Sequence, residues 1–102
     1  MAKSREDLHE ILCKILGTRN CYFQPPSNIR RNYPCIDYEL TRIDNIHADN
    51  IPYLNAKAYT LTYIDEDPDS EIPDKILQLP YCSFDRPYNA DGLHHTVFTL
   101  YY

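Results

Sequence analysis

Hydrophobic and polar residues alternate with two different periods along this chain, and the change of period divides it into helices and strands. Near the N-terminus, apolar residues recur at helical spacing on one stripe from Leu8 to Leu16, and Gly17 follows as a stop signal. Ser4 can cap the N-terminal end of this segment. The spacing predicts a helix whose apolar stripe packs on another hydrophobic surface.

A period of two predicts strands over much of the remaining chain. Five segments have this pattern: residues 20–24, 35–43, 56–64, 81–85 and 96–102. The last segment carries β-branched or large apolar residues on both faces. Its end is therefore expected inside a sheet and not in a frayed tail. A small sheet with aromatic residues on both faces favours assembly with a neighbouring molecule over solitary catalysis.

The segments between these strands differ in character. Residues 44–54 are polar and contain Pro52, so this stretch is interpreted as a long loop or an extended hairpin arm. Residues 86–95 are interpreted as a loop. The acidic run after residue 64 predicts a second, shorter helix that is capped by Asp69 or Ser70 and ends at Pro80. Its inward-facing residues are predicted to be Ile72, Ile76, Leu77 and Leu79.

The order of these elements, α-β-β-β-α-β-β, predicts an α+β fold. We expect one domain over residues 1–102, with a mostly antiparallel sheet of four to five strands and two helices packed on one face. At 102 residues the chain has room for one modest core.

Charge and cysteine usage narrow the classes of function. The net charge is −5 and the sequence shows no basic stripe, which argues against a nucleic-acid-binding protein that neutralises phosphates. The four cysteines form no C-x-x-C pair and lie among apolar neighbours, so reduced, buried thiols are expected at Cys13, Cys21, Cys35 and Cys82. No signal peptide and no segment of membrane-spanning length is visible, which predicts a soluble protein made in a reducing cytoplasm.

The acidic run was tested as a metal site. Asp65, Asp67 and Asp69 have the alternate spacing that opens a calcium loop, but Ser70 stands where glycine is expected and Ile76 where a bidentate glutamate is expected. Carboxylates also gather at helix N-termini because the helix dipole favours them there. We therefore predict no metal, no cofactor and no catalytic residue, and a protein that is not an enzyme.

Aromatic residues give a stronger signal than these polar groups. The chain has ten tyrosines, three phenylalanines and no tryptophan. Tyrosine is enriched where proteins meet, and it also forms cross-strand pairs within a sheet, so both roles are expected together. Candidate contact residues lie in the two interpreted loops, although each can also anchor a turn: Ile46, Ile51, Tyr53, Arg86, Tyr88, Leu93, His94 and His95. His94 and His95 cannot chelate one ion together if they lie on a strand, because neighbouring side chains there point to opposite faces.

With this element order, nearly the whole chain resembles the tail terminator, or tail completion, proteins of long-tailed bacteriophages. The resemblance rests on the first helix and on six segments: residues 22–26 (YFQPP), 33–36 (YPCI), 59–65 (YTLTYID), 67–70 (DPDS), 84–86 (FDR) and 91–98 (DGLHHTVF). It implies a structural protein of the virion, located at the tail or neck and assembled in the host cytoplasm.

The resemblance further implies a homo-oligomeric, hexameric ring that sits on the last ring of the tail tube, stops its polymerisation and offers the head-joining surface. The implied partners are other copies of the chain, the major tail tube protein and a head-closure or neck protein. DNA would only pass through the lumen, and no membrane is involved. The alternatives are a head-closure or connector subunit, a small divalent-metal enzyme using Asp65, Asp67 and Asp69, and a dimeric host regulatory or toxin–antitoxin module.

Overall fold

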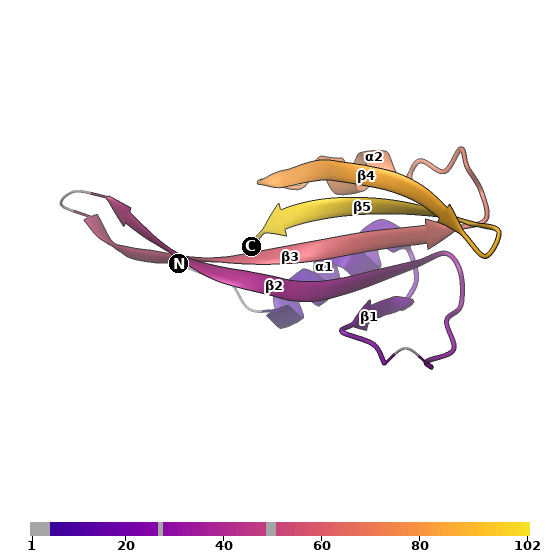
Figure 1. Cartoon of the computed structure of the whole chain (residues 1–102), viewed down its shortest axis with the longest axis horizontal. Coiled ribbons are helices and arrows are strands. Elements are labelled where there is room, and N and C mark those ends of the chain that lie inside the picture. The colour runs from indigo at the N-terminus through magenta and orange to yellow at the C-terminus, as the bar shows by residue number, and fades with distance from the viewer. Residues whose placement is uncertain (1–4, 27, 49–50) are drawn as a thin grey trace.

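The computed structural model describes residues 5–26, 28–48 and 51–102, with side chains described outside residues 42–56. It confirms the α+β class and the predicted element order (Figure 1). The elements are α1 (Arg5–Leu16), β1 (Cys21–Phe23), β2 (Cys35–Ala48), β3 (Ile51–Asp65), α2 (Ile72–Leu77), β4 (Cys82–Ala90) and β5 (Leu93–Tyr101).

The strands form one sheet in the order β1-β2-β3-β5-β4, with both helices on one face (Figure 1). Only β1 and β2 are parallel; every other neighbouring pair is antiparallel. The final strand of the chain, β5, lies between β3 and β4, as its apolar residues on both faces predicted. The opposite face of the sheet is not covered by a helix, and we call it the open face.

Residues 44–54 are not a loop. Strands β2 and β3 continue through this stretch as a hairpin, and the last paired residues are Ala48 and Ile51. Of the two interpretations offered by the sequence, the extended hairpin arm is confirmed and the long loop is wrong. The alternation was hard to follow because register shifts interrupt it between Leu40 and Arg42 and between Ile46 and Ala48. A bulge moves the following side chains out of the simple period of two.

Residues 86–95 were also wrongly interpreted as a loop. β4 runs to Ala90 and β5 begins at Leu93, so only Asp91 and Gly92 form the turn. Both turn residues have positive φ, +54° and +76°, which is the backbone that an Asp-Gly pair adopts in a two-residue hairpin turn. A register shift between Phe84 and Arg86 again broke the period of two that would have revealed the strand.

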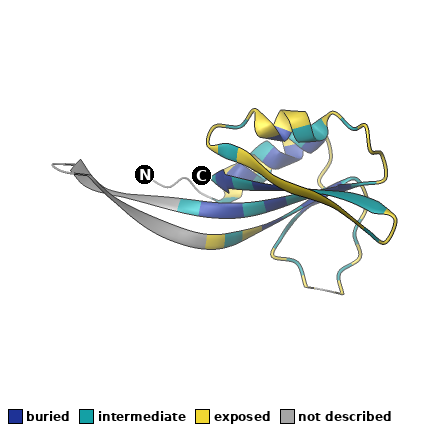
Figure 2. Ribbon diagram, turned by 45° about the horizontal axis from the view of Figure 1, so that its top comes forward, coloured by how far each residue is buried: buried dark blue, intermediate teal, exposed yellow. Residues whose placement is uncertain are grey.

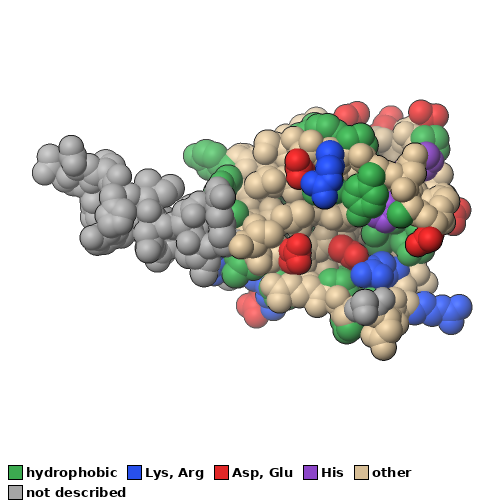
Figure 3. All heavy atoms as spheres, viewed as in Figure 1, with side chains coloured by type: hydrophobic (Ala, Val, Ile, Leu, Met, Phe, Trp, Pro, Cys, Tyr) green, Lys and Arg blue, Asp and Glu red, His purple; other side chains and the backbone are tan. Residues whose placement is uncertain are grey.

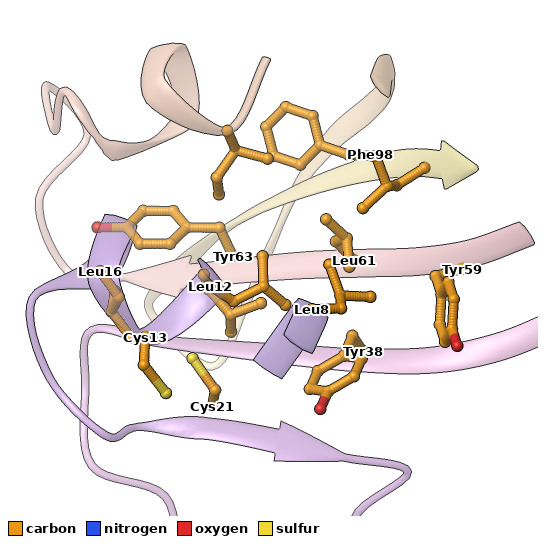
Figure 4. Packing of buried hydrophobic residues seen from close by; sticks show 13 residues of the cluster. Leu8, Leu12, Cys13, Leu16, Cys21, Tyr38, Tyr59, Leu61, Tyr63 and Phe98 are labelled. Carbon is orange, nitrogen blue, oxygen red and sulfur yellow. The ribbon is translucent and has the colours of Figure 1, made fainter. Parts of the chain in front are cut away.

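The core lies between the helices and the sheet. The buried α1 residues Leu8, Leu12 and Leu16 confirm the predicted stripe, and they point toward the strands in Figure 4. Their buried partners are mainly large side chains of the sheet and one residue of α2: Ile36, Tyr38, Tyr59, Leu61, Tyr63, Ile76, Phe98 and Leu100. The alternation of β2 and β3 therefore places its apolar members on the helix-covered face, as predicted.

The helix ends agree only in part with the predicted signals. Gly17 has φ +83° and its N–H donates to the Cys13 carbonyl at 2.9 Å, so it ends α1 as expected. Ser4, the predicted cap of α1, lies outside the described residues. In α2 the N-cap position is Glu71, one residue later than predicted, although the Ser70 Oγ accepts a hydrogen bond from the Ile72 N–H at 3.2 Å.

Candidate interaction surfaces

The acidic loop before α2 uses its carboxylates to hold its own backbone. The Asp65 Oδ1 accepts the Asp67 N–H at 3.2 Å, and the Asp67 Oδ1 accepts the Asp69 N–H at 2.9 Å. The Tyr63 hydroxyl donates to the Asp65 Oδ2 at 2.6 Å. Burial and this bonded carboxylate raise the pKa of Tyr63 above its ordinary value. Within the described part of the chain, no group of three His, Cys, Asp or Glu residues is arranged to hold a metal ion.

The cysteines behave as small hydrophobic residues. Cys13, Cys21 and Cys35 are buried and none of the four forms a disulfide, which agrees with the predicted reduced thiols. Cys82, at the start of β4, is only partly buried. Burial raises the pKa of Cys35 to about 12, so this thiol stays protonated and unreactive at neutral pH.

Three of the predicted contact residues gather on the open face of the sheet. The rings of Tyr88 and His95 stack with centroids 4.5 Å apart and planes 16° apart, because β4 and β5 place these residues opposite one another. The Arg86 guanidinium carbon lies 6.0 Å from the Tyr88 ring centroid, and Arg86 also pairs with Asp85 at 3.0 Å. Figure 3 views the molecule from this side and shows acidic, basic and hydrophobic side chains close together on it.

Leu93 and His94 do not join this group. Leu93 is the first residue of β5 and pairs with Ala90 across the turn. His94 pairs with Asp65 on β3 and Asn89 on β4, and as the strand neighbour of His95 it points to the other face. The structure therefore brings together Arg86, Tyr88 and His95 and leaves the other two predicted residues apart.

A shallow polar hollow lies beside this group on the open face. Its volume is about 230 Å³, and its lining residues are Pro25, Arg31, Asp37, Tyr38, Glu39, Thr60 and Thr62. The Arg31 Nε donates to both carboxylate oxygens of Asp37, at 2.9 and 3.1 Å. The hollow is therefore polar, and one of its two carboxylates is already paired with Arg31.

The β4 edge is the part of the sheet with the most exposed aromatic area. Figure 2 shows β4 as exposed along most of its length. Tyr81 is 82% exposed and Phe84 is 50% exposed, although Phe84 meets the buried Phe98 edge-on with centroids 6.2 Å apart. Leu77 of α2, predicted to face inward, is 40% exposed beside this edge, so that prediction is wrong. Sequence reasoning missed these contact candidates, and the signal that marks β4 as an edge strand is Pro87.

Only the first part of the β4 edge can pair with another strand. The Tyr101 N–H donates a hydrogen bond to the Tyr81 carbonyl. Because the backbone N–H and C=O groups of successive strand residues point to alternate sides, those of Cys82 and Phe84 point away from β5. After the register shift the outward position falls on Pro87, which has no N–H to donate. The shift and the proline thus shorten the pairing edge to a few residues.

The β2–β3 arm is the second candidate surface, because its two strands extend past their ladders with the rest of the sheet. β1 pairs with β2 only up to Tyr38, and β5 pairs with β3 only from Ala58 onward. The Tyr102 N–H still donates to the Lys57 carbonyl at 3.0 Å. Farther out, the ladders of the described residues pair the two strands with each other, as at Ile46 and Leu54. The predicted contact residues Ile46, Ile51 and Tyr53 lie on this arm, and their side chains are outside the described part of the structure.

Among the described residues, no helix is long and apolar enough to cross a membrane. No family model, no curated protein and no solved structure matches this chain.

Proposed function

We propose that this chain is a structural subunit of a long-tailed phage, which caps the tail tube as a hexameric ring, stops tail polymerisation and presents the head-joining surface. The observation that carries the proposal is the β2–β3 arm, which continues past the last contact of β2 and β3 with the rest of the sheet (Figure 1). The ring, its stoichiometry and its position on the tube come from the resemblance to tail terminator proteins.

The arm supports an assembly role for a physical reason. A two-stranded ribbon alone in water is marginally stable, because it buries little apolar surface and exposes its backbone on both sides. The arm here also contains apolar residues, such as Ile46 paired with Leu54. Contact with a neighbouring subunit or with the tail tube would give the ribbon the packing that an isolated two-stranded hairpin lacks.

The charge of the chain fits a ring through which DNA passes. At −5 the subunit repels the phosphate backbone on balance, and the described cationic side chains of the open face are paired: Arg31 with Asp37 and Arg86 with Asp85. A lumen with this character lets DNA move without holding it.

The test is electron microscopy of particles from the phage that encodes this chain, with and without the gene. Tails of abnormal length that carry no heads are the expected result without it. Tails of normal length beside empty heads would instead assign the chain to head closure. Complete, infectious particles made without the gene would remove it from the virion pathway altogether.

A second test removes the arm and keeps the rest of the fold. Replacing residues 44–56 with Asn-Gly joins Ile43 to Lys57, which are already cross-strand partners, through a two-residue turn. We expect the shortened protein to fold and to fail to complement the missing gene. Glu39→Gln, an exposed change on the open face, is the matched control and is expected to complement. Full complementation by the shortened protein would show that the arm is not what caps the tube.

A further inference from the structure

The two outer edges of the sheet carry charges of opposite sign. Residues 65–91, which include α2 and β4, contain eight acidic and two basic residues. Residues 11–36, which include β1 and the loop after it, contain four basic residues and no acidic one. Since β1 and β4 are the two end strands of the sheet, the acidic and basic segments lie at opposite edges.

The acidic edge is formed by the loop before α2, which carries five of the acidic residues, and by α2 and β4, where Asp74 and Asp85 stand beside Lys75 and Arg86. Asp74 and Leu77 are three residues apart on α2 and so share a helix face, and Asp85 follows Phe84 on β4. Asp74 is exposed, and Asp85 is exposed beside Arg86. In Figure 3 acidic side chains follow the upper border of the molecule, above these elements.

The basic edge is built by β1 and the loop that folds back along it. The Asn20 Nδ2 donates to the Pro34 carbonyl at 3.3 Å, and the Asn32 N–H donates to the Tyr22 hydroxyl at 3.2 Å. These bonds hold the loop against β1, so that Arg19, Arg30 and Tyr33 share this edge of the molecule. Arg30 is exposed, and Arg19 is exposed while it pairs with Glu10 at 3.0 Å. Lys and Arg side chains stand out at the lower right of Figure 3, beyond β1.

Exposed large apolar side chains occur at the same two edges. Leu77, Tyr81 and Phe84 lie at the acidic edge, and Tyr33, 40% exposed, lies at the basic edge. An edge that combines an aromatic centre with charges of one sign has the composition of a protein interface. Two such edges with opposite charges on one molecule fit each other.

Tyr81 gives an independent sign that the acidic edge contacts another molecule. Its φ is +59°, a backbone conformation that costs a bulky residue energy and that glycine or asparagine adopts more easily. Its ring is 82% exposed, so burial within the chain does not offset this cost. A strained residue that holds an aromatic ring out into solvent is explained if the ring packs against a partner.

We propose that the acidic edge of one copy docks on the basic edge of a second copy, with Tyr81 and Phe84 at the centre of the contact. The contact joins different surfaces of the two copies, so repeating it gives a closed ring or an open filament. This inference rests on the proposed function for its biological setting, because a ring needs such a head-to-tail contact, but the docking itself is measured on the purified chain.

The test uses charge reversal at each edge in turn. The first variant carries Asp74→Lys and Asp85→Lys, and the second carries Arg19→Glu and Arg30→Glu. Each alone places like charges on both edges, and we expect the dissociation constant for self-association, measured by sedimentation velocity, to rise at least about tenfold. An equimolar mixture restores opposite charges at every contact, and association is expected to return.

Glu6→Lys is the control, since it changes the charge at an exposed position of α1 and shifts the net charge in the same direction as the first variant. This control is expected to associate like the parent. Circular dichroism and thermal unfolding confirm that all the variants are folded.

Several results would overturn the docking. One is a parent protein that stays monomeric up to about 1 mM. Another is a pair of charge variants that each associate like the parent, and a third is a mixture that does not recover association. None of these changes the tail-length phenotype without the gene, which tests the proposed function separately. Complete particles made without the gene would remove that function and leave a measured docking intact.

Discussion

β4 and β5 form one hairpin, yet the two strands have opposite environments. β5 is paired on both sides and contributes Val97, Phe98 and Leu100 to the buried set. β4 is paired on one side, and its residues between Cys82 and Ala90 are exposed. The hairpin thus joins a strand that holds the fold together to a strand whose side chains are available to other molecules.

This difference separates side chains that stabilise the fold from side chains that reach solvent. The Phe98 ring is in the core and the Phe84 ring, directly across the ladder, covers only one side of it. Two identical residue types at paired positions therefore have different consequences when they are changed.

Phe98→Ala is expected to lower the free energy of unfolding by about 3–5 kcal/mol, because it empties a fully buried site in the core. Phe84→Ala is its matched comparison and is expected to cost no more than about 1–2 kcal/mol, since half of the ring is already in contact with water. Urea denaturation measures both. Equal losses for the two variants would contradict the contrast between the strands.

Alkaline pH is expected to destabilise the protein partly through Cys35. Its pKa in the folded state is about 12, above the ordinary value of 9.0, so the folded protein retains this proton longer than the unfolded chain does. The contribution to stability is complete below about pH 9 and is lost as the pH rises toward 12, by up to about 1.4 kcal/mol per pH unit. Cys35→Ala should flatten the pH dependence of the unfolding free energy in this range. An unchanged slope would mean that Cys35 does not carry it.

Gly92→Ala is expected to destabilise the β4–β5 hairpin by about 1 kcal/mol. The added methyl group would meet no atom within 4 Å, so the loss would come from the backbone alone, at φ +76°. Thermal unfolding measures it, and Gly92→Asn is the control because asparagine tolerates this conformation better. A Gly92→Asn protein less stable than Gly92→Ala would argue against this cause.

Tyr81→Asn is expected to raise the unfolding free energy slightly, by about 0.5–1 kcal/mol, because asparagine suits φ +59° better than tyrosine does. The same change removes the exposed ring and should weaken self-association measured by sedimentation. A more stable protein that associates less would separate the contact role of Tyr81 from any structural role. Lower stability together with unchanged association would exclude that contact role.

The body of the fold could be predicted from the sequence because its signals are local and regular. The helical stripe of α1 and the alternation of β2 up to Leu40 both persist for several turns or residues, and a buried face enforces them. The α+β class and the position of both helices on one face followed from the order of these elements.

The outer parts of the β2–β3 and β4–β5 hairpins could not be predicted from such a local pattern. The register shift between Phe84 and Arg86 lies where the predicted fourth strand was stopped, and the one between Ile46 and Ala48 lies in the stretch interpreted as a loop. A bulge removes the period of two without removing the strand. The Asp-Gly pair at residues 91 and 92 was the available signal for the second hairpin.

Exposure at the β4 edge could be predicted from the sequence only in part. Arg86, Tyr88 and His95 do meet, because one hairpin aligns them on the open face. Tyr81 and Leu77 were missed or assigned to the interior, since exposure at an edge depends on which strand ends the sheet. That order is a property of the whole fold and not of the local pattern.

Pro87 has a consequence for the behaviour of the protein at high concentration. An exposed, aromatic strand is ordinarily a nucleus for amyloid, in which identical segments stack without limit along a cross-β spine. Here a strand that pairs with the first residues of β4 reaches Pro87 after a few residues, and the ladder ends there because proline has no N–H to donate. The molecule can therefore expose aromatic side chains at the β4 edge while it resists fibril growth.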